Sequence, residues 1–112
     1  MSQITTHILD TTKGKPAAGV TIALWQQSGD NWQEIARGVT NNDGRIADLL
    51  PKERQLELGV YKMKFFTKEY FAQDDTANFY PLVEIIFEVA TTEHYHVPLL
   101  LNPFGYATYR GS

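Results

Sequence analysis

Hydrophobic and polar residues alternate along most of this chain with a period of two. In residues 83–89 every odd position is apolar, while Glu84 and Glu88 occupy two of the even positions. Residues 61–65 repeat the pattern, with Lys62 and Lys64 on the polar side. Successive side chains of a β-strand point to opposite faces, so this period places one apolar face against a core. The alternation therefore predicts half-buried β-strands.

The alternating runs and the turn residues between them predict eight strands and one short helix. Only residues 68–75 (KEYFAQDD) look helical. Turn residues separate the other runs: residues 13–16 are predicted as a turn, and Asp43-Gly44 is typical of a tight hairpin turn because both residues tolerate positive φ. Short strands at this spacing favour an all-β fold, an eight-stranded antiparallel sandwich of two sheets in a single domain, residues 1–112. The predicted strands cover residues 4–10, 20–27, 32–40, 45–49, 58–67, 82–90, 94–101 and 104–110.

Composition narrows the class of protein further. The 112 residues are 43% hydrophobic with a formal net charge of −3, which favours one packed core and excludes a disordered chain. The lack of a surplus of Lys and Arg argues against a general nucleic-acid binder. The absence of cysteine excludes disulfides, thiol nucleophiles and Cys-based metal sites. The longest apolar run, Val97–Leu101, is far below the roughly 20 residues of a membrane span. With no signal-like N-terminus, we expect a soluble, cytoplasmic protein without a membrane partner.

The three histidines are the first candidates for chemistry. His94 and His96 lie two residues apart, so in a strand both imidazoles leave the same face. His7 shares a face of the first strand with Thr5 and Leu9. A zinc site built from these histidines, general acid–base catalysis and simple surface placement are all compatible with the spacing.

Arg45 and the C-terminus are the other candidates. Arg45 follows the Asp43-Gly44 turn, and its planar guanidinium suits a carbonyl-rich or anionic ligand, although an arginine beside a turn is often only a solvated surface residue. The chain keeps a strand-like alternation from Phe104 almost to its last residue, Ser112, which indicates either a packed terminus or an ordinary edge strand.

Several separated segments give the sequence a family resemblance. Together they resemble the transthyretin superfamily, and the terminal Tyr-Arg-Gly-Ser is typical of its 5-hydroxyisourate hydrolase branch rather than of the hormone-carrying transthyretins. The similarity covers essentially the whole chain and its motifs agree in order. The segments are Thr6–Asp10, Gly14–Ala17, Gly44-Arg45, Gly59–Lys62, Tyr95–Tyr106 and Tyr109–Ser112.

This resemblance implies a fold, an assembly and a site. It implies an eight-stranded sandwich with one short helix, assembled as a homotetramer of two dimers with clefts where the dimers meet. It implies hydrolysis of the small molecule 5-hydroxyisourate without a metal or other cofactor. The catalytic residues it implies are His7, Arg45, His96 and Ser112, and the substrate-binding residues are His7, Arg45, Tyr109, Arg110, Gly111 and Ser112.

The resemblance also suggests a role for each side chain. His96, together with His7, would activate water and transfer protons, and Arg45 would hold the carbonyl or oxyanion edge of the substrate. Tyr109 and Ser112 would close the pocket and form hydrogen bonds. His94 has no role in this scheme and is expected at the surface. The alternatives are a small-molecule carrier of transthyretin type, a zinc protein using His7, His94 and His96, and an acyl-enzyme route through Ser112.

Overall fold

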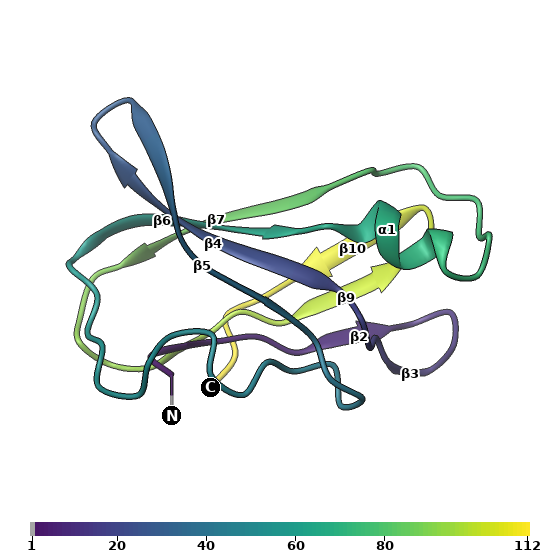
Figure 1. Ribbon diagram of the computed structural model, residues 1–112, viewed down its shortest axis with the longest axis horizontal. Helices are drawn as coiled ribbons and strands as arrows, with labels where there is room; N and C mark the ends of the chain where they lie inside the picture. Colours follow the sequence, from purple (N-terminus) through teal and green to yellow (C-terminus); the bar gives the residue numbers. More distant parts are fainter. Residues whose placement is uncertain (1) are drawn as a thin grey trace.

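The computed structural model describes residues 2–112, which form two facing β-sheets with one short helix beside them (Figure 1). One sheet has the order β10-β9-β2-β3 and the other β5-β4-β6-β7, while β1 and β8 form a separate pair. The predicted all-β sandwich is confirmed. The elements are β1 (Ile4–Thr5), β2 (Ile8–Asp10), β3 (Lys15–Pro16), β4 (Thr21–Ser28), β5 (Asn31–Val39), β6 (Gly59–Phe65), α1 (Thr67–Ala72), β7 (Val83–Val89), β8 (Tyr95–His96), β9 (Leu99–Asn102) and β10 (Gly105–Thr108).

Two predicted strands, 4–10 and 94–101, are each interrupted once. The two segments pair in the same register on both sides of the interruption, β1 with β8 and β2 with β9. Ile4 lies opposite Tyr95, and four residues later Ile8 lies opposite Leu99. The interruption falls at Pro98, which has no backbone N–H to donate to a ladder. Both pairings are parallel, which corrects the expectation of a purely antiparallel sandwich. Parallel neighbours need a long crossover, and here the whole second sheet lies within that connection.

The predicted strand 45–49 is wrong. This segment contributes a single bridge, between His7 and Arg45, and then bends. The end of this segment explains the bend, because Leu49 and its neighbour Leu50 are both buried. Two consecutive side chains of a strand cannot face the same core, so the backbone must leave the sheet to bury both.

Smaller differences concern the turns and the helix. Residues 15–16, predicted as turn, form the edge strand β3, where Pro16 is tolerated. The helix begins at Thr67 and ends at Ala72, earlier than predicted, and Asp75 beyond it adopts φ 51°. The Asp43-Gly44 turn forms with Gly44 at φ 73° and its N–H donating to Asn41, but it leads to one bridge rather than into a hairpin.

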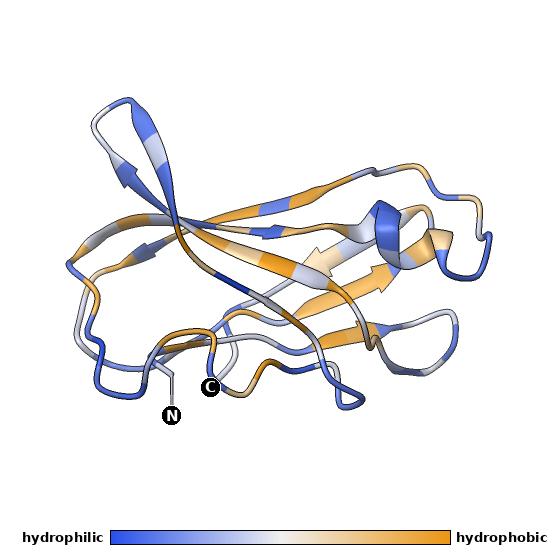
Figure 2. Ribbon diagram, in the orientation of Figure 1, coloured by the Kyte–Doolittle hydropathy of each residue, from blue (hydrophilic) through white to orange (hydrophobic). Residues whose placement is uncertain are grey.

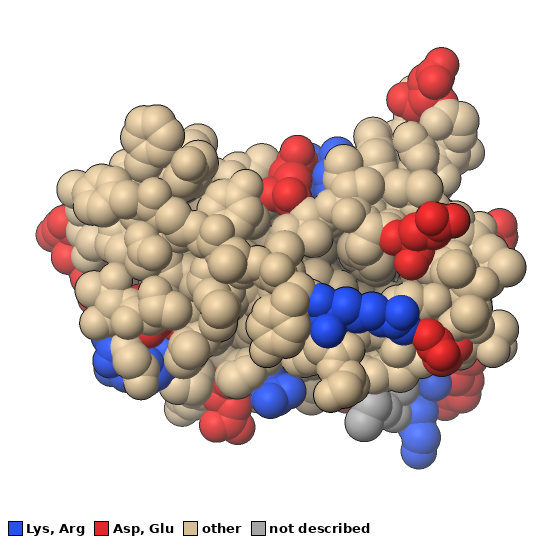
Figure 3. Space-filling model, turned by 180° about the vertical axis from the view of Figure 1, so that it is seen from behind, with Lys and Arg blue, Asp and Glu red and all other residues tan. Residues whose placement is uncertain are grey.

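The core lies between the two sheets, where the hydrophobic strand residues meet (Figure 2). Tyr61, Met63 and Phe65 are fully buried, and the intervening lysines face outward. On the face seen in Figure 3, the left and central part consists mostly of uncharged residues, while charged side chains gather at the right and along the lower edge. Within residues 2–112, no helix is both long and apolar enough to cross a membrane.

Candidate active site

Most of the predicted site residues line one cleft of about 490 Å³. Six of them come together there from four separate parts of the chain. Two residues to which the family resemblance gave no role, Thr5 and His94, join them. The complete lining is Thr5, His7, Arg45, His94, His96, Tyr109, Gly111 and Ser112.

Backbone pairing brings these parts of the chain together. The parallel pairing of β1 with β8 places Thr5 opposite His96. A bridge joins His7 to Arg45, and a second bridge joins His96 to Gly111. The His96 carbonyl accepts a 2.9 Å hydrogen bond from the Gly111 N–H. The C-terminus is therefore held beside His96, although the two are far apart in sequence.

His7 and Arg45 form one side of the cleft. Nη2 of Arg45 lies 3.5 Å from Nδ1 of His7. Burial and then the Arg45 charge lower the pKa of His7 below its usual value of 6.5, while the Asp43 carbonyl and carboxylate oppose this shift. His7 therefore stays neutral at pH 7 and can accept a proton.

His96 lies at the centre of the cleft. Its Nδ1 is 2.8 Å from the hydroxyl oxygen of Thr5. Burial lowers the pKa of His96, and the nearby charges of Arg45, His94 and His7 lower it further, against an opposing effect of the Thr5 backbone carbonyl. His96 is therefore a second neutral imidazole at pH 7.

Gly111 approaches the ring of His96 so closely that no larger residue fits. A Cβ at this position would overlap Cδ2 of His96 and lie 3.1 Å from its Cγ. We therefore expect Gly111→Ala to displace the imidazole and to lower turnover by about tenfold or more, since an error of ~1 Å at a reacting group can cost a hundredfold. Steady-state kinetics on the purified variant would measure the loss.

Gly105→Ala is the matched control for this substitution. A Cβ at Gly105 would lie 3.5 Å from the Asn102 side chain, which is ordinary contact. Gly105 begins β10, away from the cleft lining. Equal turnover of the two variants would show that the close approach of Gly111 has no consequence for the site.

Arg110 is the one predicted site residue that does not line this cleft. Its guanidinium lies 4.5 Å from the centroid of the Tyr95 ring and pairs with Glu93. Together with β7 residues it lines a second cavity, of about 340 Å³. Its contacts with Glu93 and Tyr95 hold the side chain outside the cleft lining, and its role in substrate binding stays a prediction.

His94 is exposed, as expected, but it also borders the cleft. Its two-residue spacing from His96 was the feature of the sequence that could have placed His94 in the cleft. For Thr5 the corresponding feature was the strand face that it shares with His7. Among residues 2–112, the His, Asp and Glu side chains form no group of three that could hold a metal ion. The zinc alternative therefore has no ligand set in this part of the chain.

Comparison with known proteins agrees with the fold and the cleft. The model of the HIUase/Transthyretin family matches residues 4–111. A 5-hydroxyisourate hydrolase from Halalkalibacterium halodurans is 44% identical, covering 98% of each chain.

Two solved structures share the fold. The 5-hydroxyisourate hydrolase of Klebsiella pneumoniae superposes with a TM-score of 0.86 at 36% identity, covering 97% of this chain and 98% of that one. Transthyretin from sea bream, in complex with thyroxine, gives a TM-score of 0.90 at 34% identity, with 97% and 94% coverage. The family match over nearly the whole length and these identities lead to one conclusion: the chain belongs to the HIUase/transthyretin family.

Proposed function

We propose that this protein hydrolyses 5-hydroxyisourate, opening the six-membered ring to give 2-oxo-4-hydroxy-4-carboxy-5-ureidoimidazoline. One observation carries the proposal: the imidazoles of His7 and His96 and the guanidinium of Arg45 meet in a cleft of about 490 Å³, which Tyr109, Gly111 and Ser112 also line. The relatives named as 5-hydroxyisourate hydrolases support the choice of substrate.

The cleft residues divide the tasks of amide hydrolysis. The reaction needs a base for water, a positive group for the charge that develops on the carbonyl oxygen, and a proton for the departing nitrogen. His96 and His7 take and return the proton, and Arg45 stabilises the oxyanion. Tyr109 and Ser112 close the pocket and form hydrogen bonds to substrate or water. No step in this scheme uses a metal.

The fold alone does not distinguish a hydrolase from a small-molecule carrier of transthyretin type. The sea bream transthyretin superposes at least as well as the Klebsiella hydrolase, with TM-scores of 0.90 and 0.86. The choice therefore depends on the side chains, and imidazoles beside a guanidinium supply acid–base chemistry that binding alone does not require.

The direct test follows the ultraviolet decay of freshly generated 5-hydroxyisourate with and without the protein. We expect micromolar protein to accelerate the decay strongly. Unchanged decay, together with saturable binding of a small aromatic ligand, would instead favour a carrier of transthyretin type.

The lowered pKa values of His7 and His96 predict the pH dependence of this activity. A histidine that acts as a base must be neutral, and a lowered pKa keeps it neutral to lower pH. Activity should therefore be fully present at pH 7 and be lost only as the pH falls below 6.5, the usual value for this side chain. A profile of kcat/KM from about pH 5 to 8 would show this acid limb.

Arg45→Gln tests the cause of the shift. Burial lowers both pKa values most, and the Arg45 charge is the next contribution in each case. Removing that charge should move the acid limb to higher pH, in addition to lowering the maximal rate. An acid limb at the wild-type position would show that Arg45 does not set the protonation of the histidines.

We also infer a homotetramer made of two dimers, with the clefts at the dimer–dimer interface. β7 and β10 lie at the edges of their sheets, where a second copy can pair. Large hydrophobic side chains on or beside these strands are exposed, among them Ile86, Phe104, Tyr106 and Tyr109. The mostly uncharged left and central part of the face in Figure 3 also suits self-association.

Light scattering tests the assembly. Four chains of 12.7 kDa predict a particle of about 51 kDa. Activity should fall on dilution below the dissociation range of the tetramer, because the interface shapes the cleft. A fully active monomer would contradict the placement of the site between dimers.

A further inference from the structure

One hydroxyl group joins the two histidines of the His94-Tyr95-His96 segment. Oγ1 of Thr5 lies 2.7 Å from Nε2 of His94 and 2.8 Å from Nδ1 of His96. The two imidazole rings lie nearly parallel, with an interplanar angle of 25° and centroids 6.3 Å apart. Strand pairing determines this arrangement, because Thr5 of β1 lies directly opposite His96 of β8.

The single proton of this hydroxyl couples the protonation of the two rings. If Thr5 donates to Nε2 of His94, it can only accept from an N–H at Nδ1 of His96. His96 is then the tautomer whose Nε2 has a free lone pair. If Thr5 instead donates to Nδ1 of His96, a neutral His96 carries its proton on Nε2 and cannot act as a base there.

The charges around His96 favour the first arrangement, in which the ring can release one proton as it takes up another. The backbone carbonyl of Thr5 raises the pKa of His96, but burial outweighs this effect. Positive charge on His96 itself is opposed by Arg45, His94 and His7. His96 is thus best placed to accept a proton when it can release another.

We propose that Thr5 and His94 are positioning residues that hold His96 in the Nδ1–H tautomer and receive the proton it releases. The inference rests on the proposed hydrolysis. As Nε2 of His96 takes a proton from the attacking water, Nδ1 gives its proton to Oγ1 of Thr5. The Thr5 hydroxyl gives its own proton to Nε2 of His94. Hydroxide forms in the cleft, His96 stays neutral, and the positive charge moves to His94.

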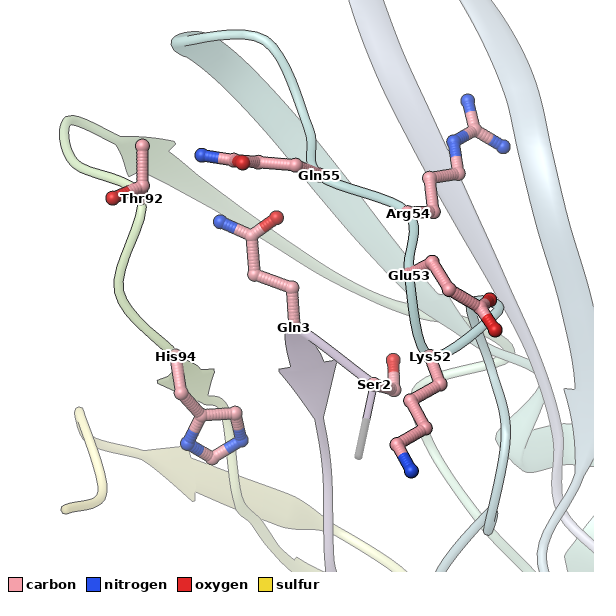
Figure 4. A pocket seen from close by; sticks show the side chains of 8 residues that line it. All are labelled: Ser2, Gln3, Lys52, Glu53, Arg54, Gln55, Thr92 and His94. Atoms are coloured by element: carbon pink, nitrogen blue, oxygen red, sulfur yellow. The ribbon is translucent and has the colours of Figure 1, made fainter.

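His94 has a suitable position for this charge. It is exposed, and besides the cleft it borders a polar pocket of about 280 Å³. In Figure 4 the His94 ring lies across from residues 52–55, with Gln3 between them. Charged side chains of both signs, Lys52, Glu53 and Arg54, line this pocket. The charge can therefore remain on His94 at the surface until the proton returns through Thr5 to Nδ1 of His96, while Nε2 of His96 gives its proton to the departing nitrogen.

Thr5→Val and Thr5→Ser test the hydroxyl. Valine keeps the β-branched shape and removes the hydroxyl, whereas serine retains it. Loss of a hydrogen bond to a group that becomes charged predicts a fall in kcat of about 10–100-fold for Thr5→Val, with KM changed less than about threefold. Thr5→Ser should keep kcat within about threefold of wild type, because its hydroxyl restores the contact.

His94→Gln separates tautomer control from proton transfer. The glutamine amide oxygen can accept from Thr5 but cannot take up a proton. We expect kcat to fall while His96 keeps its tautomer. Wild-type kcat in His94→Gln would overturn the transfer step.

Nitrogen-15 NMR of the His96 ring in the substrate-free protein reports the tautomer without relying on activity. We expect Nδ1–H in wild type, Thr5→Ser and His94→Gln, and a mixture in Thr5→Val. An inactive wild-type protein would refute the hydrolase proposal, yet the spectrum would still decide the tautomer. Nε2–H in the wild type, or a Thr5→Val variant with unchanged kcat and spectrum, would overturn the inference.

Discussion

His96→Asn should lower kcat by about 10²–10⁴-fold, the usual contribution of a general acid–base group. His96 lines the cleft with its Nδ1 bound to Thr5 and its pKa held below the ordinary range. Asparagine is polar and of similar volume but does not titrate, so the loss comes from chemistry rather than from packing. Steady-state kinetics at pH 7 would measure it, with substrate generated immediately before use.

Folding must be checked in the same variant. His96 is only partly buried, and its backbone carbonyl still accepts from Gly111 whatever the side chain. Circular dichroism and the thermal midpoint should therefore stay close to wild type. The double variant with His7→Asn should lose much less than the product of the two single losses, because residues that act as a unit are not additive. Nearly full activity of His96→Asn would remove this residue from the mechanism.

Alternation in the sequence predicts the long strands well, because their faces differ sharply in polarity. Residues 61–65 and 83–89 lie in β6 and β7 with the apolar positions facing the core and the charged ones outward. This signal depends only on local side-chain order. Parallel pairing of β2 with β9 depends on how the whole chain crosses between sheets, and so no local pattern contains it.

Breaks in strands were harder to predict from the sequence. Pro98 lies within an apolar run whose hydrophobicity favours a continuous strand, although its missing N–H interrupts the ladder. The adjacent Leu49 and Leu50 were a usable signal that residues 45–49 leave the sheet, since both are buried.

In the candidate site, too, the sequence predicts the residues but not the contacts that depend on strand pairing. Motif resemblance identified His7, Arg45, His96 and Ser112, which the structure brings into one cleft. The link between His94 and His96 could not be predicted, because it depends on the register that sets Thr5 opposite His96. Arg110 was predicted in the site because its sequence neighbours are there, whereas its guanidinium contacts Glu93 and Tyr95.

The contacts of the last four residues explain why they should matter more for activity than for folding. Strand β10 ends at Thr108, whose hydroxyl bonds to the Pro98 carbonyl, before these residues begin. The Tyr109 side chain is 59% exposed. Beyond β10, the backbone bond from Gly111 to His96 is worth about 1 kcal/mol, and the exposed pair of Arg110 with Glu93 stabilises little.

Deleting residues 109–112 should abolish most activity while the protein stays folded, with only a small decrease in the thermal midpoint. The deletion removes Tyr109, Gly111 and Ser112 from the cleft lining and the backbone contact that holds His96 from one side. Kinetics, circular dichroism and thermal melting of the truncated chain would measure the two effects separately. A bulky C-terminal tag should have the same effect, because it would have to pass through the cleft, whereas an N-terminal tag is the matched control. Normal turnover by the truncated protein would show that residues 109–112 only extend an edge strand and do not belong to the site.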